Sequence, residues 1–121
     1  MTKERRMKRL IESAKRYALR SSCWVRAGAV IVGRKGTIVS AGWNHAGLSG
    51  YGQHAEAEAI ARLPPHTKGV KIIVAKWNGR KWLTSYPCRG CSALIVARSI
   101  PTICYYDGKG WRENGEACIK L

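Results

Sequence analysis

The chain contains two short segments, His54-Ala55-Glu56 and Pro87-Cys88-Arg89-Gly90-Cys91, that decide its fold and place its chemistry. Cys88 and Cys91 are three residues apart, so in the first turn of a helix both sulfur atoms can face one point. His54 would bring a nitrogen atom from the start of a second helix. Three protein ligands leave the fourth position of a tetrahedral zinc ion open for water, which is the catalytic rather than the structural arrangement.

Glu56 lies two residues after the histidine, too close for a second ligand on the same helical face. A carboxylate there is well placed to exchange a proton with a zinc-bound water. Each segment alone has a simpler interpretation: C-x-x-C can be half of a structural zinc site or a redox pair, and H-x-E can be a helix start with a favourable acid. Their occurrence together, with Pro87 directly before the first cysteine, favours a catalytic zinc site.

The composition limits the class of protein. A chain of 121 residues can bury one core, so we expect a single domain over residues 1–121. No run of about eighteen apolar residues and no signal-peptide pattern occurs, so we expect no membrane partner. Cys23, Cys104 and Cys118 lack the spacing of a disulfide framework, which favours a reducing cytoplasm. Cys104, within an apolar run, is predicted to be a small core residue.

The charge is strongly positive. Lys and Arg number 22 against 7 Asp and Glu, for a net charge of +15. Such a balance favours partners that carry phosphate, either nucleotides or nucleic acids. The alternative is a solvated surface that serves only solubility. Many of these cations lie on the outer face of a predicted helix over 2–20, whose apolar residues recur every three or four positions.

Periodicity and turn residues predict three helices and about five strands. The predicted helices cover 2–20, 54–63 and 87–99. The predicted strands cover 27–32, 37–41, 70–77 and 100–106, with a short return strand at 82–84 and a last short strand after Gly110. Residues 46–53 are predicted to form a loop. This order indicates an α/β fold, a three-layer α/β/α sandwich around a mixed sheet. Both zinc segments begin helices beside one sheet, so their positive N-termini can converge and favour thiolates.

The chain as a whole resembles the cytidine deaminase-like superfamily, whose zinc nucleobase deaminases carry H-x-E followed by P-C-x-x-C. Arg26–Val32 (RAGAVIV) is similar to the first strand of that superfamily, and Ser40–Asn44 (SAGWN) is similar to its second. Thr84–Cys88 (TSYPC) is similar to the segment before its metal cysteines. The resemblance extends from about residue 10 to residue 106 and implies a cytidine deaminase-like fold.

The resemblance also implies zinc-dependent hydrolytic deamination. One Zn²⁺ per chain would be held by His54, Cys88 and Cys91. Glu56 would accept a proton from the zinc-bound water, protonate N3 of cytosine and help to expel ammonia, which leaves uracil. A non-catalytic module that keeps zinc for stability is disfavoured, because a structural zinc ion does not need a proton shuttle.

Three further residues take substrate-binding roles by the same resemblance. The backbone N–H of Ala55 would meet the 2-oxo group of the pyrimidine, and the carbonyl of Ser85 would accept from the leaving amino group. Asn44 would contact the sugar, although a turn-forming role explains an asparagine there equally well. We also expect a homo-oligomer.

The branch of the superfamily depends on the C-terminal end. A short Asp107-Gly108 turn would make the last two strands antiparallel, because parallel neighbours need a long crossover. An antiparallel last strand resembles cytidine deaminases, whereas nucleic-acid-editing, tRNA adenosine and deoxycytidylate deaminases carry a crossover helix. The opening, with Ser22-Cys23 followed by GAVIV and GWN, resembles deoxycytidylate deaminase instead.

The predicted function is therefore deamination of cytosine in a cytidine or deoxycytidine nucleoside or nucleotide. The alternative substrate is cytosine in single-stranded DNA or RNA. Five Trp, five Tyr and the positive charge favour the strand, since basic grooves with stacking aromatics bind single strands. Short loops around the predicted site favour the small-molecule substrate.

Overall fold

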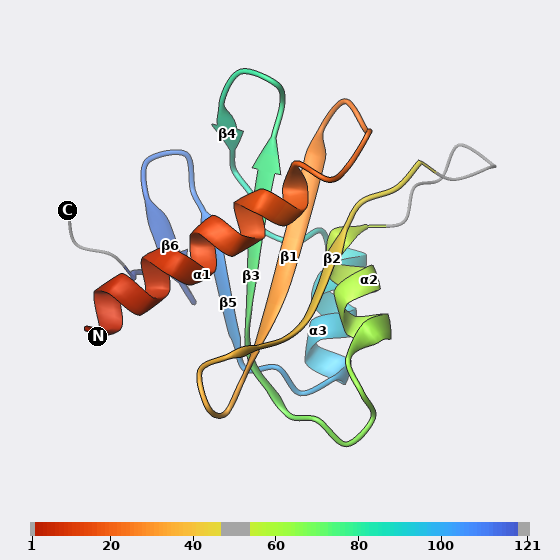
Figure 1. Ribbon diagram of the computed structural model, residues 1–121, viewed down its shortest axis with the longest axis vertical. Helices are drawn as coiled ribbons and strands as arrows, with labels where there is room; N and C mark the ends of the chain where they lie inside the picture. The colour runs from red at the N-terminus through yellow and green to blue at the C-terminus, as the bar shows by residue number, and fades with distance from the viewer. Residues whose placement is uncertain (1, 47–53, 119–121) are drawn as a thin grey trace.

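One mixed β-sheet runs through the middle of the molecule, with one helix on one face and two on the other (Figure 1). The computed structural model describes residues 2–46 and 54–118. The helices are α1 (Lys3–Ala18), α2 (Ala55–Arg62) and α3 (Arg89–Ala97). The strands are β1 (Arg26–Gly33), β2 (Ile38–Trp43), β3 (Gly69–Trp77), β4 (Trp82–Leu83), β5 (Thr102–Tyr106), β6 (Trp111–Glu113) and β7 (Glu116–Ala117).

The strand order in the sheet is β2-β1-β3-β5-β6-β7, and β4 pairs with β3 outside this path. β1 is antiparallel to β2 and to β3, β3 is parallel to β5, and β5 is antiparallel to β6. The predicted three-layer sandwich and the antiparallel pairing across Asp107-Gly108 are confirmed. In the described residues the sheet has seven strands rather than about five. The short return predicted at 82–84 is β4, and the single segment predicted after Gly110 forms two strands, β6 and β7, of which β7 is too short for a period of two to show in the sequence.

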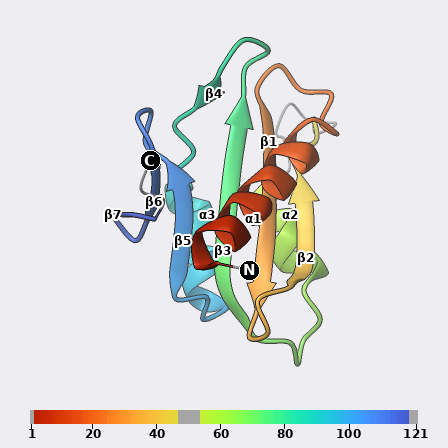
Figure 2. The ribbon, with the colours of Figure 1, turned by 60° about the vertical axis from the view of Figure 1, so that its left-hand side comes forward.

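Helix α1 packs on β1 and β3 through its apolar stripe, which buries Met7, Leu10 and Ala14. The side chain of Thr2 caps the helix by accepting the N–H of Arg5 at 3.2 Å. The helix lies very close to β1, because a Cβ atom on Gly28 would be 2.3 Å from the carbonyl oxygen of Ala14. Figure 2 shows α1 in front of the sheet, with α2 and α3 behind it.

Alternate residues of β3 build two separate cores. Ile72 and Val74 face α2 and α3, whereas Ile73 and Ala75 face α1. Cys104 lies in the α1-side core, as predicted. No helix in the described part of the chain is long and apolar enough to cross a membrane.

The predicted element ends differ from the observed ones by up to two residues in most cases. Two adjacent ends both differ between α3 and β5, where the helix stops at Ala97 and the strand starts only at Thr102. Ser99 adopts a left-handed conformation (φ 61°), which ends the helix, and Pro101 has no N–H to donate to a sheet. Of the predicted loop over 46–53, all but Ala46 lies outside the described residues.

Candidate active site

The first turns of α2 and α3 are held next to each other on one face of the sheet. His54 is the N-cap residue of α2, and Cys88 is the N-cap residue of α3, both with extended backbone. Cys91 follows in the first turn of α3. The backbone N–H of Ser92 donates to the Cys88 carbonyl at 2.8 Å, and its hydroxyl donates to the Pro87 carbonyl at 3.2 Å. These two bonds fix the conformation in which Cys88 enters the helix.

The three predicted ligands are brought together. Nδ1 of His54 lies 3.3 Å from Sγ of Cys91 and 3.5 Å from Sγ of Cys88. All three donor atoms lie within 4.8 Å of one another. Bonds of about 2.0–2.1 Å to nitrogen and about 2.3 Å to sulfur place such atoms about 3.6 Å apart around a tetrahedral zinc ion. The donor types and the spacing therefore fit zinc.

The two cysteines lie in different electrostatic environments. Burial, and after it the nearby carboxylate of Glu56, raises the pKa of the Cys91 thiol to about 12. The backbone N–H of Cys91, which points at Sγ of Cys88, lowers the pKa of the Cys88 thiol below its usual value. A bound cation favours the thiolate at both positions, so a metal ion would compensate for the burial of Cys91.

Glu56 is buried in the first turn of α2, with 2% of its surface exposed. It is close enough to both cysteines to influence their ionisation. Carboxylates are rarely buried to this degree without a partner or a function. Its proton-transfer role stays a prediction.

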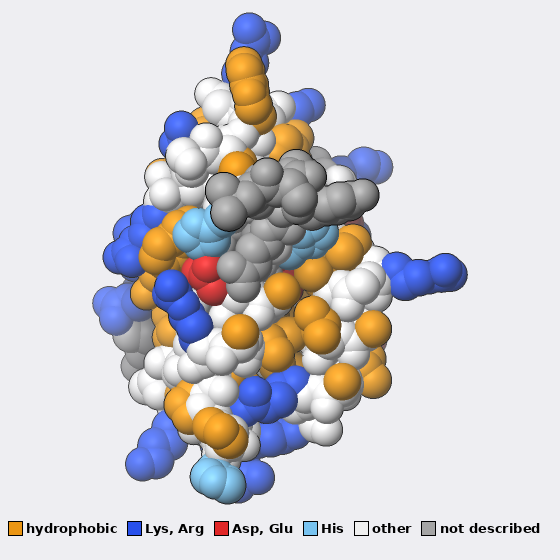
Figure 3. Space-filling view, turned by 90° about the vertical axis from the view of Figure 1, so that its right-hand side faces the viewer, with side chains coloured by type: hydrophobic (Ala, Val, Ile, Leu, Met, Phe, Trp, Pro, Cys, Tyr) orange, Lys and Arg blue, Asp and Glu red, His pale blue; other side chains and the backbone are white. Residues whose placement is uncertain are grey.

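Glu58 is a second buried acid of α2, for which the sequence pattern predicted no role. It accepts the N–H of Trp43 at 3.3 Å and pairs with Nε2 of His45 at 2.5 Å and with Arg62 at 3.5 Å. These contacts hold the end of β2 against α2. On the side of the molecule seen in Figure 3, a small acidic patch lies next to histidine and to Lys or Arg side chains. An acid and a base four residues apart on a helix face each other, so the spacing of Glu58 and Arg62 indicates their ion pair in the sequence.

Asn44 uses its side chain to join the end of β2 to the start of β1. Its Oδ1 accepts the N–H of Ala27 at 2.7 Å, and its Nδ2 donates to the carbonyl of Val25 at 2.8 Å. An amide has two hydrogens and two lone pairs, so one of each is left over by these two bonds. These bonds reach residues 17 and 19 positions away rather than closing a local turn, so the side chain of Asn44 ties two strand ends together, and its sugar contact stays a prediction.

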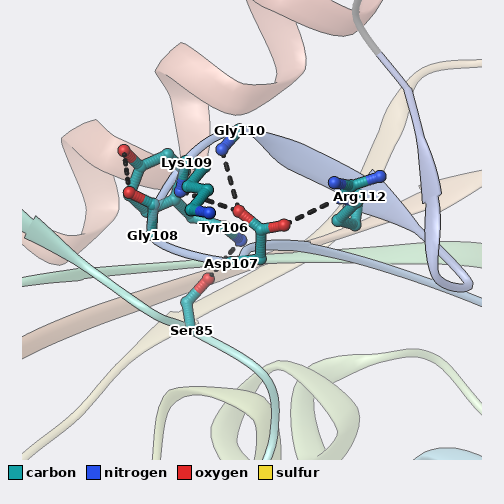
Figure 4. Close-up of polar contacts among 7 residues, drawn as sticks. All are labelled: Ser85, Tyr106, Asp107, Gly108, Lys109, Gly110 and Arg112. Atoms are coloured by element: carbon teal, nitrogen blue, oxygen red, sulfur yellow. Dashed lines mark hydrogen bonds and ion pairs between the residues drawn. The ribbon is translucent and has the colours of Figure 1, made fainter.

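Ser85 and Ala55 are both fully buried. The Ser85 hydroxyl donates to the Val74 carbonyl at 2.6 Å. It also accepts the N–H of Tyr106 at 2.8 Å, as Figure 4 shows. The N–H of Ser85 donates to the Tyr106 carbonyl at 2.9 Å. These bonds anchor the segment before Cys88 to β3 and β5. Ala55 opens α2, so its N–H is one of the first four, which have no partner inside the helix.

Comparison with known protein families also indicates a zinc-binding deaminase. Residues 1–107 match the model of the cytidine and deoxycytidylate deaminase zinc-binding region. A search of curated proteins gave no match.

Solved structures of deaminases share the fold. Cytidine deaminase from Burkholderia pseudomallei is 20% identical, with a TM-score of 0.70 over 98% of this chain and 94% of that one. Cytidine deaminase from Mycobacterium leprae is also 20% identical, with a TM-score of 0.69 over 88% of this chain and 92% of that one. The dCMP deaminase of cyanophage S-TIM5 is 21% identical, with a TM-score of 0.64 over 85% and 82%. The match to the zinc-binding region covers most of the sequence, and the chain therefore belongs to the cytidine and deoxycytidylate deaminase zinc-binding family.

Proposed function

We propose that this hydrolytic deaminase converts cytosine to uracil in free cytidine or deoxycytidine, as the nucleoside or the nucleotide. One observation carries the chemistry: a buried glutamate, Glu56, lies beside a donor set of His54, Cys88 and Cys91 whose spacing fits zinc. All four residues come from the first turns of two helices that rest on the same sheet. Membership of the family supports deamination of cytosine.

When bound, a zinc ion lowers the pKa of water and so supplies a nucleophile at neutral pH. The carboxylate of Glu56 takes the proton that this water loses and delivers it to N3 of cytosine as oxygen adds to C4. Glu56 then moves the second proton to the amino group, which leaves C4 as ammonia. Water is consumed, and uracil and ammonia are formed. One carboxylate serves both transfers, and such acid–base help is typically worth about 10²–10⁴-fold.

The substrate contacts proposed for Ala55, Ser85 and Asn44 would orient the pyrimidine for this attack. The N–H of Ala55 lies at the positive end of α2, which suits a 2-oxo group that accepts a hydrogen bond. Ser85 is held by three hydrogen bonds to β3 and β5, so its carbonyl has a fixed position from which to accept the amino group. Asn44 keeps one donor and one acceptor for a sugar hydroxyl.

The antiparallel pairing of β5 and β6 supports a free substrate, because this arrangement resembles that of cytidine deaminases. Cytosine in single-stranded DNA or RNA is the alternative, supported by the net charge of +15. A homo-oligomer also stays a prediction, which light scattering of the purified protein tests.

The test is uracil formation from cytidine, deoxycytidine, their monophosphates and cytosine-containing single strands, measured side by side at equal cytosine concentration. We expect turnover of at least one free substrate, and a loss of about 10²–10⁴-fold after Glu56→Gln. Turnover of strands alone would contradict the proposed substrate class and leave the deaminase chemistry intact. No turnover of any of these substrates by zinc-loaded protein would contradict both.

A further inference from the structure

A groove of ≈ 630 Å³ opens on the α1 face of the sheet, away from the zinc donors. It lies between the turn that joins β3 to β4 and the turn that joins β5 to β6. Trp82 and Trp111, which line it, also pack against the core beneath α1. Figure 2 shows β4 and the β5–β6 turn at the same end of the sheet.

Four aromatic rings line this groove in two pairs. The ring centroids of Trp77 and Trp82 are 4.9 Å apart, and those of Tyr106 and Trp111 are 5.6 Å apart. All four side chains are half-buried, so each ring rests on the protein and keeps part of its surface accessible. Cross-strand aromatic pairs stabilise hairpins, which accounts for the pairing of Trp77 with Trp82 but not for the charge around the rings.

Every charged side chain that lines the groove is a cation. Arg80 and Lys81 are exposed in the β3–β4 turn, and Lys15 projects from α1 with its Nζ 5.0 Å from the ring centre of Trp82. Among the described residues, no acid lines the groove. Glu12 pairs with Lys15 at 3.5 Å, but 58% of its side-chain surface is exposed, so solvent screens this pair.

Asp107, the acid nearest in sequence to the groove wall at Gly108, is fully engaged by its own turn. Its Oδ1 accepts the N–H groups of Lys109 and Gly110 at 2.7 and 2.9 Å, and its Oδ2 accepts Nε–H of Arg112 at 2.8 Å (Figure 4). The ion pair with Arg112 compensates the negative charge locally. The groove therefore keeps a positive potential.

Cations beside accessible aromatic rings suit a ligand that offers both phosphates and unpaired bases. We propose that this groove binds single-stranded nucleic acid, independently of the zinc site. An acidic peptide would use the cations but leave the four rings uncovered, and a duplex would hide its base faces. The sheet separates the groove from the zinc donors, so this binding goes beyond the deamination proposed above.

The charge is tested with a matched pair of variants. Arg80→Gln with Lys81→Gln removes two exposed cations from the groove, and Arg34→Gln with Lys35→Gln removes the same dipeptide from the β1–β2 turn. That turn lies at the opposite end of the sheet, because β1 and β3 are antiparallel. Binding of labelled oligothymidylate and oligouridylate, about 15 nucleotides long, is followed by fluorescence anisotropy at several salt concentrations.

We expect wild type to bind either strand at low salt, with an affinity that falls as salt rises. Each phosphate contact contributes about 0.7 to the slope of log K against log salt for single strands, so the groove variant should flatten the slope by about 1.4. The Arg34 and Lys35 variant should change it far less. Cytidine turnover should be unchanged in the groove variant.

The stacking is tested with Trp77→Leu, because Trp77 is not among the aromatic residues that pack against the α1-side core. This variant should bind strands at least about fivefold more weakly, as expected for one lost base stack. Its melting temperature should fall only slightly, because a single cross-strand pair, here with Trp82, contributes little to stability. A duplex of equal length should bind more weakly than the single strand.

Four results would overturn the proposal. Absence of binding at low salt would show that the groove takes no strand. Equal losses of strand affinity in the two double variants would show that total charge alone is responsible. Displacement of the strand by free mononucleotide at equal phosphate concentration would indicate a single-nucleotide site, and loss of cytidine turnover in the groove variant would indicate that the groove is part of the deaminase site.

Discussion

The two faces of the sheet are built by alternate residues of the same strands, yet they carry different chemistry. On the α2–α3 face, the strands bury aliphatic side chains, and the helix starts above them enclose Glu56 beside Cys91. On the α1 face, the strand ends carry half-buried aromatic rings with Lys and Arg around them. The period of two in a strand lets one chain keep an enclosed donor set and an open cationic groove apart.

Tightness of packing does not explain this difference. Both helical layers approach the sheet over a glycine. A Cβ atom on Gly28 would be 2.3 Å from the backbone oxygen of Ala14, and one on Gly42 would be 2.7 Å from backbone atoms of Ala55 and Ala59. The difference between the faces therefore lies in the polar residues at helix starts and strand ends.

The largest effect expected on the α2–α3 face is that of Glu56→Gln. Glutamine keeps the shape of the side chain but cannot carry the proton between water, N3 and the amino group. Cytidine turnover should fall by at least about 10²–10⁴-fold, while zinc content and melting temperature stay near those of wild type. Steady-state kinetics and metal analysis of the same preparation check this.

Glu58→Gln is the matched control, because Glu58 is the other buried acid of α2. It loses a charged partner for His45 and Arg62, so the protein should melt at a lower temperature. Turnover should stay within about tenfold of wild type, below the range typical of a lost proton shuttle. Equal losses of turnover in the two variants would show that Glu56 has no special role.

The next effect compares the two glycines directly. Gly28→Ala and Gly42→Ala should each lower the free energy of unfolding by about 1–3 kcal/mol, because backbone atoms must move to make room. Only Gly42→Ala displaces α2, and with it His54, so only that variant should bind zinc more weakly. Urea unfolding and competition with a chromophoric chelator measure the two quantities. Equal zinc affinity in both variants would mean that the position of α2 does not control the site.

The smallest effect concerns the β5–β6 turn beside the groove. Arg112 and two backbone N–H groups lower the pKa of Asp107 to about 2. A carboxylate with a lowered folded-state pKa stabilises the protein above its unfolded-state pKa and loses that contribution as pH falls through the folded value. Asp107→Asn should therefore melt slightly below wild type at pH 7, and the difference should vanish between about pH 4 and pH 2. A difference in melting temperature that is constant with pH would contradict this ion pair.

The sequence was most informative where residue types and spacing are local. The H-x-E and C-x-x-C segments predicted two helix starts and a donor set, and the Asp-Gly turn predicted an antiparallel pair; the donor atoms converge and the strands pair accordingly. The ties of Asn44 to Val25 and of Glu58 to Trp43 join residues 19 and 15 positions apart. No local pattern reveals such contacts. The groove needs three separate segments, so it appears only once the sheet is assembled.

Zinc at His54, Cys88 and Cys91 is the feature on which the proposed chemistry most depends. The most direct test removes the metal from one preparation with a chelator and then adds zinc back. At each stage it measures zinc content and uracil formation from cytidine, deoxycytidine or their monophosphates. We expect about one zinc ion per chain, turnover that falls in proportion to the zinc removed and returns with it, and no tightly bound zinc in Cys91→Ala. Full turnover by zinc-free protein, or a folded Cys91→Ala variant with its full complement of zinc, would contradict the assignment.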